Sequence, residues 1–343
     1  MTDAIHRTDA LVIGAGPVGL FTVFQCGMLR IKCHVVDVLD NIGGQCAALY
    51  PEKPIFDIPA HPSVLAGDLI DKLSQQVEPF APVYHLGQQV IGLTRTEDGR
   101  WRAETSKGTV IEAAVVMIAA GAGAFGPNRP PLKGLEAYEG TSVFYYVTRR
   151  EEYRGKKVVI AGGGDSAVDW AISLSEVAAS VQVVHRRAKF RCAPESAARL
   201  QELADAGKIE LVVPYQLSAL HGDNGVLTGG VLTGVEVADL DGGTRVLDAD
   251  VLLPFFGLAT DLGPIAGWGL AMERSTITID PTTGATNVPG IFAMGDVCHY
   301  PHKLKLILTG FAEAAQAAHA CYSLVFPGEV LHFQHSTSAG VPA

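Results

Sequence analysis

The amino-acid sequence predicts an α/β protein in which one structural plan is used twice. Residues 9–39 read as a buried strand, a glycine turn, a helix and a second strand, and residues 156–187 repeat this order. Each unit is followed by alternating apolar and polar residues with turn sequences, which indicates a β-meander that ends in a buried strand. A short strand within residues 287–300 and a long helix over 303–326 complete the chain. These observations predict two Rossmann-like, three-layer ββα domains.

Length and composition limit the possible partners. A chain of 343 residues is long enough for two domains, and 48% hydrophobic with 18% charged residues is an ordinary globular composition. The 26 basic and 36 acidic residues give a net charge of -10. This charge argues against nucleic acid or an anionic membrane as the main partner.

The cysteines and the N-terminus indicate a cytoplasmic location. The six cysteines include no C-x-x-C pair and no zinc-type spacing with histidine, so we expect buried thiols in a reducing compartment and no metal site. The N-terminal residues do not read as a signal peptide, and glycines or charges interrupt every apolar segment. We therefore expect no transmembrane helix.

The first glycine turn, VIGAGPVG, has Gly14, Gly16 and Gly19 in the spacing G-x-G-x-x-G. These glycines permit a tight turn, the approach of a pyrophosphate and close packing of helix on strand, and the helix N-terminus favours an anion. Asp37 ends the next strand, where a carboxylate accepts hydrogen bonds from both ribose hydroxyls of an adenosine. The pattern predicts a dinucleotide site and by itself leaves NAD and FAD open.

The second glycine turn, IAGGGDSAVD, has Gly162, Gly164 and Ala167 in the spacing G-x-G-x-x-A. Asp165 lies inside this turn, and we expect it to cap the following helix. Arginines at the end of the next strand favour the 2′-phosphate of NADP through bidentate, charge-assisted hydrogen bonds, so this site is predicted to take NADPH and not NADH. In place of the acid of the first unit, the basic residues at this strand end are His185, Arg186, Arg187 and Arg191.

Residues 143–153, VFYYVTRREEY, precede the second unit and contain no cysteine. The whole pattern resembles the thioredoxin-reductase-like flavoproteins over nearly the full chain, and a thioredoxin reductase carries its C-x-x-C dithiol at this place. The resemblance therefore implies electron transfer from the flavin directly to an external acceptor. Three stretches are similar to the bacterial ferredoxin–NADP(+) reductases of this type: GGQCAALYPEKPIFDIP, GDVCHYPHKLKLILTGFAEAA and the terminal HSTSAG.

The resemblance implies an FAD-binding domain, residues 1–121 and 288–343, interrupted by an NADPH-binding domain, residues 122–287, with hinges at 120–126 and 282–288. It also implies a homodimer that moves electrons between NADP(H) and ferredoxin or flavodoxin. Hydride would pass between NADPH and flavin N5, and single electrons would pass between the flavin and ferredoxin. No catalytic side chain is expected, because the flavin carries the chemistry.

Carried over by position, the resemblance assigns several residues to the FAD. Asp37 binds the adenosine ribose, although glutamate is common there and the shorter side chain could loosen the contact. Asp296, in the Gly-Asp of the late motif, holds the ribityl chain. Gln45 lies along the flavin, and the ring of Tyr50 lies against the isoalloxazine.

Four further FAD contacts are implied with them. The backbone of Val90 contacts the adenine side, and Phe125 packs near the flavin at the domain crossover. Thr337 hydrogen-bonds the flavin from the C-terminal tail. His335 is a candidate to cover the other flavin face, from the partner subunit.

Docking of an acidic ferredoxin onto this acidic chain requires a local basic surface. We hypothesise that basic residues in the predicted flavin and crossover loops form that surface. They are Lys53, Arg129, Lys133, Lys303 and Lys305.

Three alternative functions remain open from the sequence. A flavin-dependent reductase of a small disulfide would need a cysteine at the flavin, and the first glycine turn has none. An NADPH-dependent diaphorase would donate to quinones or oxygen. A non-catalytic NADPH-sensing flavoprotein would have a damaged site, whereas both glycine turns and the arginines are present.

Overall fold

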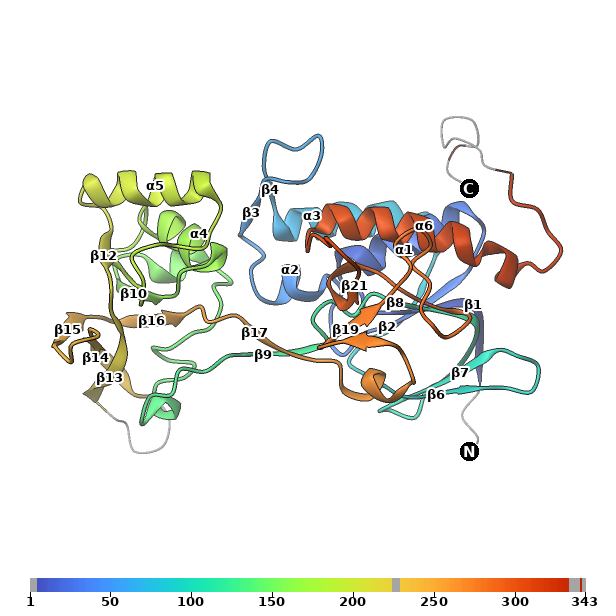
Figure 1. Ribbon diagram of the computed structural model, residues 1–343, viewed down its shortest axis with the longest axis horizontal. Coiled ribbons are helices and arrows are strands. Elements are labelled where there is room, and N and C mark those ends of the chain that lie inside the picture. Colours follow the sequence, from blue (N-terminus) through green and yellow to red (C-terminus); the bar gives the residue numbers. More distant parts are fainter. Residues whose placement is uncertain (1–4, 224–228, 333–339, 341–343) are drawn as a thin grey trace. The chain divides into compact units, whose positions relative to one another are not determined.

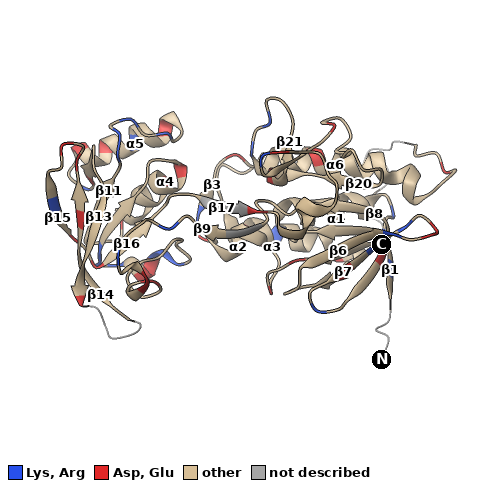
Figure 2. Ribbon diagram, turned by 60° about the horizontal axis from the view of Figure 1, so that its bottom comes forward, with Lys and Arg blue, Asp and Glu red and all other residues tan. Residues whose placement is uncertain are grey.

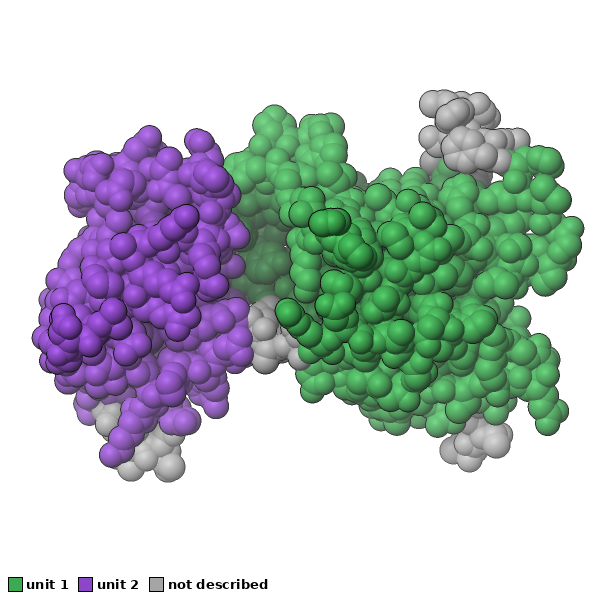
Figure 3. Space-filling view, viewed as in Figure 1, with its two compact units in different colours: residues 1–125, 260–343 green, residues 126–259 purple. Residues whose placement is uncertain are grey.

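The computed structural model describes residues 5–223, 229–332 and 340, and the chain divides into two compact units (Figure 3). Unit 1 consists of residues 1–125 and 260–343, and unit 2 consists of residues 126–259. Because the chain leaves unit 1 and later returns to it, unit 2 is an insertion.

Unit 1 contains a seven-stranded mixed sheet in the order β5-β2-β1-β8-β7-β6, with β20 also paired to β8. Strands β1, β2, β5, β8 and β20 run parallel, whereas β6 and β7 form the antiparallel meander that the sequence predicts. The long strand β8 pairs with β7 through its first half and with β20 through its second half. The strands are β1 (His6–Ile13), β2 (Cys33–Val36), β5 (Val83–His85), β6 (Val90–Arg95), β7 (Trp101–Thr105), β8 (Val110–Ile118) and β20 (Ile291–Ala293).

Helices cover one face of this sheet, namely α1 (Pro17–Met28), α3 (Ala66–Val77) and α6 (Ile307–Val325) (Figure 1). Alternate residues of β1 enter different cores, because Ala10 and Val12 pack under the helices and Leu11 and Ile13 pack on the opposite face. Burial on both faces explains why this strand is an unbroken apolar run. The predicted three-layer ββα architecture is confirmed.

The rest of unit 1 consists of short elements around the sheet. The segment after β2 forms the short helix α2 and the hairpin β3-β4, and a small sheet β18-β19-β21 follows the return from unit 2. Their bounds are α2 (Gly44–Ala48), β3 (Pro54–Ile55), β4 (Val64–Leu65), β18 (Met272–Glu273), β19 (Thr276–Thr278) and β21 (Cys298–His299).

Unit 2 repeats the plan with a four-stranded parallel sheet, order β12-β11-β10-β16, and a three-stranded antiparallel sheet, order β13-β14-β15. Helix α4 follows β10 through the second glycine turn, and α5 follows β11. The elements are β10 (Lys157–Ala161), α4 (Asp165–Leu174), β11 (Ser180–Val184), α5 (Pro194–Asp205), β12 (Glu210–Val212), β13 (Gln216–Asp223), β14 (Val231–Ala238), β15 (Thr244–Asp248) and β16 (Val251–Pro254).

The first crossover lies within the predicted residues 120–126, whereas the second lies elsewhere than the sequence predicted. The second crossover was expected at residues 282–288, but residues 260–287 belong to unit 1. The reason is their apolar side chains: Leu262, Ile265 and Ile277 fill the core on the sheet face opposite the helices. The chain crosses between the units at β9 (Ala124–Pro127) and β17 (Leu258–Asp261), which pair with each other.

The predicted C-terminal helix is confirmed as α6, which begins at Ile307, four residues after the expected start. Within the described ranges, no helix is long and apolar enough to cross a membrane.

Candidate functional site

The first glycine turn is packed so tightly that it requires glycine at two positions. Gly14 has a φ of +107°, and a Cβ there would lie 2.3 Å from the carbonyl oxygen of Ala119 at the end of β8. A Cβ on Gly19 would lie 1.9 Å from the carbonyl oxygen of Gly14, so α1 can approach the turn only with glycine there. Helix α1 then begins directly after Gly16, which is its N-cap. Its first-turn N–H groups therefore form an anion site.

Asp37 lies at the end of β2 and is bound to this turn. One oxygen of its carboxylate accepts a hydrogen bond of 2.6 Å from the Ala15 amide, and the other accepts one of 2.8 Å from the Leu39 amide. Burial raises the pKa of Asp37, and the backbone hydrogen bonds, first that from Ala15, oppose this shift. Each carboxylate oxygen keeps a second lone pair, so Asp37 can also accept from the two hydroxyls of a ribose.

A single cavity in unit 1 brings together most of the residues predicted for the first site. Its walls come from the first glycine turn, the ends of β1 and β2, α2, the start of β6, the end of β8 and the start of α6. The predicted residues that line it are Gly14, Gly16, Asp37, Gln45, Tyr50, Val90 and Asp296. Residues from opposite ends of the sequence thus share one cavity.

Other predicted residues lie elsewhere. Gly19 packs against Gly14 behind the turn, as its predicted role requires. Phe125 is in β9, and its side chain is not among those described. Thr337 and His335 lie outside the described residues. Lys305, Leu306 and Ile307 also line the cavity at the start of α6, where the sequence reading placed no flavin contact.

Tyr50, Cys46 and Asp296 form a group at the flavin end of the predicted site. Burial is the main cause that raises the pKa of Tyr50, and the neighbouring Cys46 and Asp296 raise it further. Burial raises the pKa of Cys46 to about 11. Both groups therefore stay protonated at neutral pH, and Cys46 does not form a reactive thiolate.

A buried carboxylate, Glu313 of α6, supports the turn that carries Asp296. Glu313 accepts hydrogen bonds from the Gly295 amide at 2.7 Å and from the Tyr300 hydroxyl at 2.7 Å, and it forms an ion pair with Lys303. The side chains of Lys303 and Glu313 are only 4% and 3% exposed. We did not predict this network from the sequence. The available signal was that Glu313 is the single acidic residue of α6.

This network corrects the docking hypothesis at Lys303. A side chain buried against Glu313 cannot contact another protein. Arg129 and Lys133 belong to unit 2, and Arg129 is ion-paired with Glu139. Lys53 and Lys305 remain beside the cavity, with the Lys53 ammonium 5.9 Å from the centre of the Tyr50 ring and Lys305 exposed.

The second glycine turn packs on a histidine ring. A Cβ on Gly163 would lie 2.4 Å from the ring of His185, which is buried at the end of β11. The Arg191 amide donates a 2.7 Å hydrogen bond to the Gly163 carbonyl, which holds the basic loop against the turn.

Asp165 has a different role from the predicted helix cap. No side chain caps α4, whose N-cap is Gly164. Instead, the Asp165 carboxylate accepts a 2.8 Å hydrogen bond from the Ala193 amide, at the far end of the basic loop. The basic loop folds back beside the glycine turn and brings the Ala193 amide within reach of this carboxylate. The local sequence does not show this return of the loop.

The arginines of this loop form a concentrated positive site. Arg186, Arg187 and Arg191 are all exposed around the buried His185. Burial lowers the pKa of His185, and the positive charges of Arg191 and then Arg186 lower it further. Exposed guanidinium groups on one loop suit a phosphate dianion, which accepts charge-assisted hydrogen bonds from them.

The residues present fit two dinucleotides. In unit 1, the helix N-terminus and Asp37 suit a pyrophosphate and an unphosphorylated ribose. In unit 2, the second turn with its arginine loop suits a dinucleotide with a 2′-phosphate.

This combination of fold and sites defines a nucleotide-dependent oxidoreductase with two Rossmann-like domains. The chain belongs to the pyridine nucleotide-disulphide oxidoreductase family, whose model matches residues 8–320.

Relatives that match nearly the full chain include ferredoxin–NADP reductases. The chain is 65% identical over 339 residues to that of Paramagnetospirillum magneticum, covering 99% of both chains. It is 67% identical to that of Rhodospirillum rubrum, covering 98% of this chain and 97% of the relative. The fold is similar to that of Lactococcus lactis thioredoxin reductase, with a TM-score of 0.79 and 24% identity over 93% of this chain and 99% of that chain.

We predict that Glu313→Gln destabilises unit 1 and loosens the turn of Asp296, because the Lys303 ammonium is left buried without a counter-charge. Removal of one partner of a buried pair typically costs about 3–5 kcal/mol. Chemical unfolding measures this loss, and Lys303→Met combined with Glu313→Gln should recover part of it.

The matched control is Glu202→Gln, which breaks the exposed Arg199–Glu202 pair and should cost at most about 0.5 kcal/mol. Equal losses for Glu313→Gln and Glu202→Gln would contradict the role of the buried pair.

Proposed function

We propose that this chain is an FAD-dependent ferredoxin–NADP(+) oxidoreductase, with flavodoxin as an alternative partner. The observation that carries the proposal is the cavity of unit 1, in which seven residues predicted for FAD from separate parts of the sequence lie together. The identity of 65–67% with ferredoxin–NADP reductases over nearly the full chain supports the same activity.

In this proposal the residues of unit 1 bind and orient FAD. The N-terminus of α1 holds the pyrophosphate, and Asp37 accepts from the adenosine ribose. Asp296, held by Glu313 through the Gly295 amide, reaches the ribityl chain. Tyr50 presents an aromatic ring to the flavin. When bound, FAD supplies the ability to take up two electrons with a hydride and release them singly.

The residues of unit 2 select NADPH. The exposed guanidinium groups of Arg186, Arg187 and Arg191 neutralise the 2′-phosphate, and the Gly163–Arg191 hydrogen bond keeps that loop beside the glycine turn. NADH lacks this phosphate and therefore gains nothing from the arginines.

A disulfide as the acceptor is disfavoured by the state of the thiols. All six cysteines lie in described ranges, and none forms a disulfide. The two thiols nearest the first site are buried, and burial raises the pKa of Cys46 to about 11 and of Cys298 to about 12. A thiol that attacks a disulfide must ionise near neutral pH, so neither residue suits this chemistry.

The proposal extends to the assembly. In the proposed homodimer, the C-terminal tail carries Thr337, which hydrogen-bonds the flavin, and His335, which covers the other flavin face from the partner subunit. Analytical ultracentrifugation together with a chain truncated after residue 332 tests this arrangement, because loss of the tail should alter the flavin spectrum.

Anaerobic stopped-flow spectroscopy tests the function. The FAD-loaded protein is mixed with NADPH or NADH, and the reduced protein is then mixed with ferredoxin, flavodoxin, thioredoxin, a small disulfide or a quinone. We expect rapid loss of flavin absorbance with NADPH and slow loss with NADH. Rapid recovery with ferredoxin or flavodoxin is expected, whereas recovery only with a disulfide or quinone would overturn the proposed partner.

We predict that Arg186→Ala and Arg187→Ala each lower kcat/KM for NADPH by about 10- to 100-fold, since a hydrogen bond to a charged group contributes about 1.5–3 kcal/mol. The value for NADH should stay unchanged. Steady-state kinetics with both nucleotides measure the ratio.

Arg199→Ala, on the exposed side of α5, is the control that removes an arginine of unit 2 outside the basic loop. An equal fall for NADPH and NADH in the loop variants would argue against recognition of the 2′-phosphate.

We also predict that Lys305→Glu slows electron transfer to ferredoxin at low salt, because Lys305 is exposed beside the cavity and would meet an acidic partner. NADPH-dependent reduction of ferricyanide should not change. Lys72→Glu, an exposed change in α3, is the matched control. Equal ferredoxin rates for the two variants at low salt would remove Lys305 from the docking surface.

A further inference from the structure

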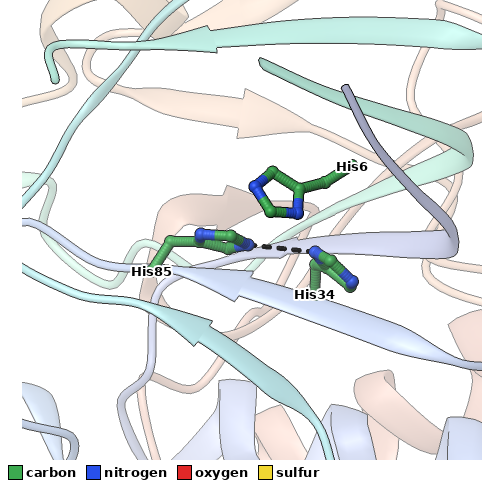
Figure 4. A group of neighbouring side chains, drawn as sticks. All are labelled: His6, His34 and His85. Atoms are coloured by element: carbon green, nitrogen blue, oxygen red, sulfur yellow. Dashed lines mark hydrogen bonds between the residues drawn. The ribbon is translucent and has the colours of Figure 1, made fainter. Parts of the chain in front are cut away.

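Three histidines from three neighbouring strands converge in unit 1, away from the cavity described above. His6 is the first residue of β1, His34 lies in β2, and His85 is the last residue of the edge strand β5. Figure 4 shows the three rings directed toward one another. One ring nitrogen from each residue lies within 4.8 Å of one from each of the others.

The closest contact in the cluster joins His34 Nδ1 and His85 Nε2 at 2.9 Å. The ring of His6 lies over both, with its centroid 5.7 Å from that of His34 and 5.0 Å from that of His85. His85 is buried, His34 is half-buried and His6 is exposed. The cluster therefore has a closed inner end and an end open to solvent.

We propose that His6, His34 and His85 form a binding site for one divalent transition-metal ion of the Zn²⁺ class. Imidazole nitrogen is a preferred ligand of Zn²⁺, Cu²⁺ and Ni²⁺, whereas Mg²⁺ and Ca²⁺ require oxygen ligands. Three histidines with a fourth position open to water form a common zinc arrangement.

The geometry needs only small side-chain movements to reach metal coordination. Tetrahedral Zn²⁺ with Zn–N bonds of about 2.0–2.1 Å separates its ligand nitrogens by about 3.3 Å. The distance between His34 Nδ1 and His85 Nε2 must increase slightly from 2.9 Å. The ring nitrogen of the exposed His6, which lies within 4.8 Å of the other two, must move closer to them. The proton between His34 and His85 moves to the other nitrogen of its own ring, so that both facing nitrogens offer a lone pair to the metal and both rings stay neutral.

A metal at this place would secure the wall of the dinucleotide cavity. The Asp37 amide donates to the His85 carbonyl at 3.2 Å, and the Gln88 amide donates to the Asp37 carbonyl at 3.0 Å. Strand β5 is otherwise held by the sheet along one side only, because it is an edge strand. Coordination by His34 and His85 would add a cross-link between the two segments that carry Asp37 and Gln88.

Equilibrium dialysis of the purified full-length protein against Zn²⁺ tests the proposal, with bound metal measured by mass spectrometry. We expect one Zn²⁺ per chain and no comparable binding of Mg²⁺ or Ca²⁺. His34→Gln and His6→Ala should each weaken Zn²⁺ binding by about 100-fold or more, since loss of an outer-shell partner alone costs about 10- to 100-fold. His6 is exposed, so its replacement leaves the fold intact.

His61→Gln is the matched control, because it removes one imidazole from the β3-β4 loop and leaves the cluster unchanged. Zinc should also raise the unfolding temperature of the wild type and of His61→Gln, but not that of His34→Gln. Stoichiometric binding retained in both His34→Gln and His6→Ala would place the metal elsewhere. Absence of one-to-one binding in the wild type would show that the cluster is an aromatic contact only.

Discussion

The hydrogen bond from the Ala15 amide to the Asp37 carboxylate is the contact on which the geometry of unit 1 depends. It joins the first glycine turn to the end of β2, and the Gly43 amide, which donates to the Ala15 carbonyl, joins the same turn to the segment of Gln45 and Tyr50. The same turn packs against the end of β8 so closely that only glycine fits at position 14 of the turn. One turn thus fixes the separations between cavity walls that are distant in sequence.

In unit 2 the glycine turn is also bound to the end of the second strand, but the charged residues at that strand end are basic and not acidic. Its glycine turn also meets the end of the second strand, but through the ring of His185 and the backbone bond from Arg191 to Gly163 in place of a carboxylate. An acid bound to the turn repels a phosphate, whereas an arginine loop bound to the turn attracts one. The duplicated fold therefore presents two glycine turns in surroundings of opposite charge, and the difference lies in the residues at one strand end.

The sequence predicted the parts of the site that depend on local geometry. Glycine spacing, the acid at Asp37 and the arginines after β11 follow from how a strand, a turn and a helix pack, so a short window contains the information. The predicted position of the second crossover was wrong because the apolar residues 262–279 could fill a core of unit 1 or of unit 2. Only the tertiary structure shows that they fill the core of unit 1. The predictions for Lys303 and Asp165 failed for a related reason. Lys303 is paired with Glu313 of α6, and Asp165 accepts from the Ala193 amide at the end of the basic loop. Both contacts depend on how the chain folds back, which a short stretch of sequence does not show.

The acidic composition limits how this chain could recognise the acidic partner of the proposed function. Basic and acidic residues are interspersed over both units (Figure 2), and the net charge is -10. At physiological ionic strength charges are screened beyond about 8 Å, so the overall repulsion weakens quickly and attraction must come from lysines at the contact itself. Because Glu313 removes Lys303 from that set, Lys53 and Lys305 are the basic residues of the docking hypothesis that lie beside the cavity in the described part of the chain. In the proposed complex, recognition would then depend on short-range fit beside the cavity, with a shallower salt dependence than electrostatic steering by a large basic face would give.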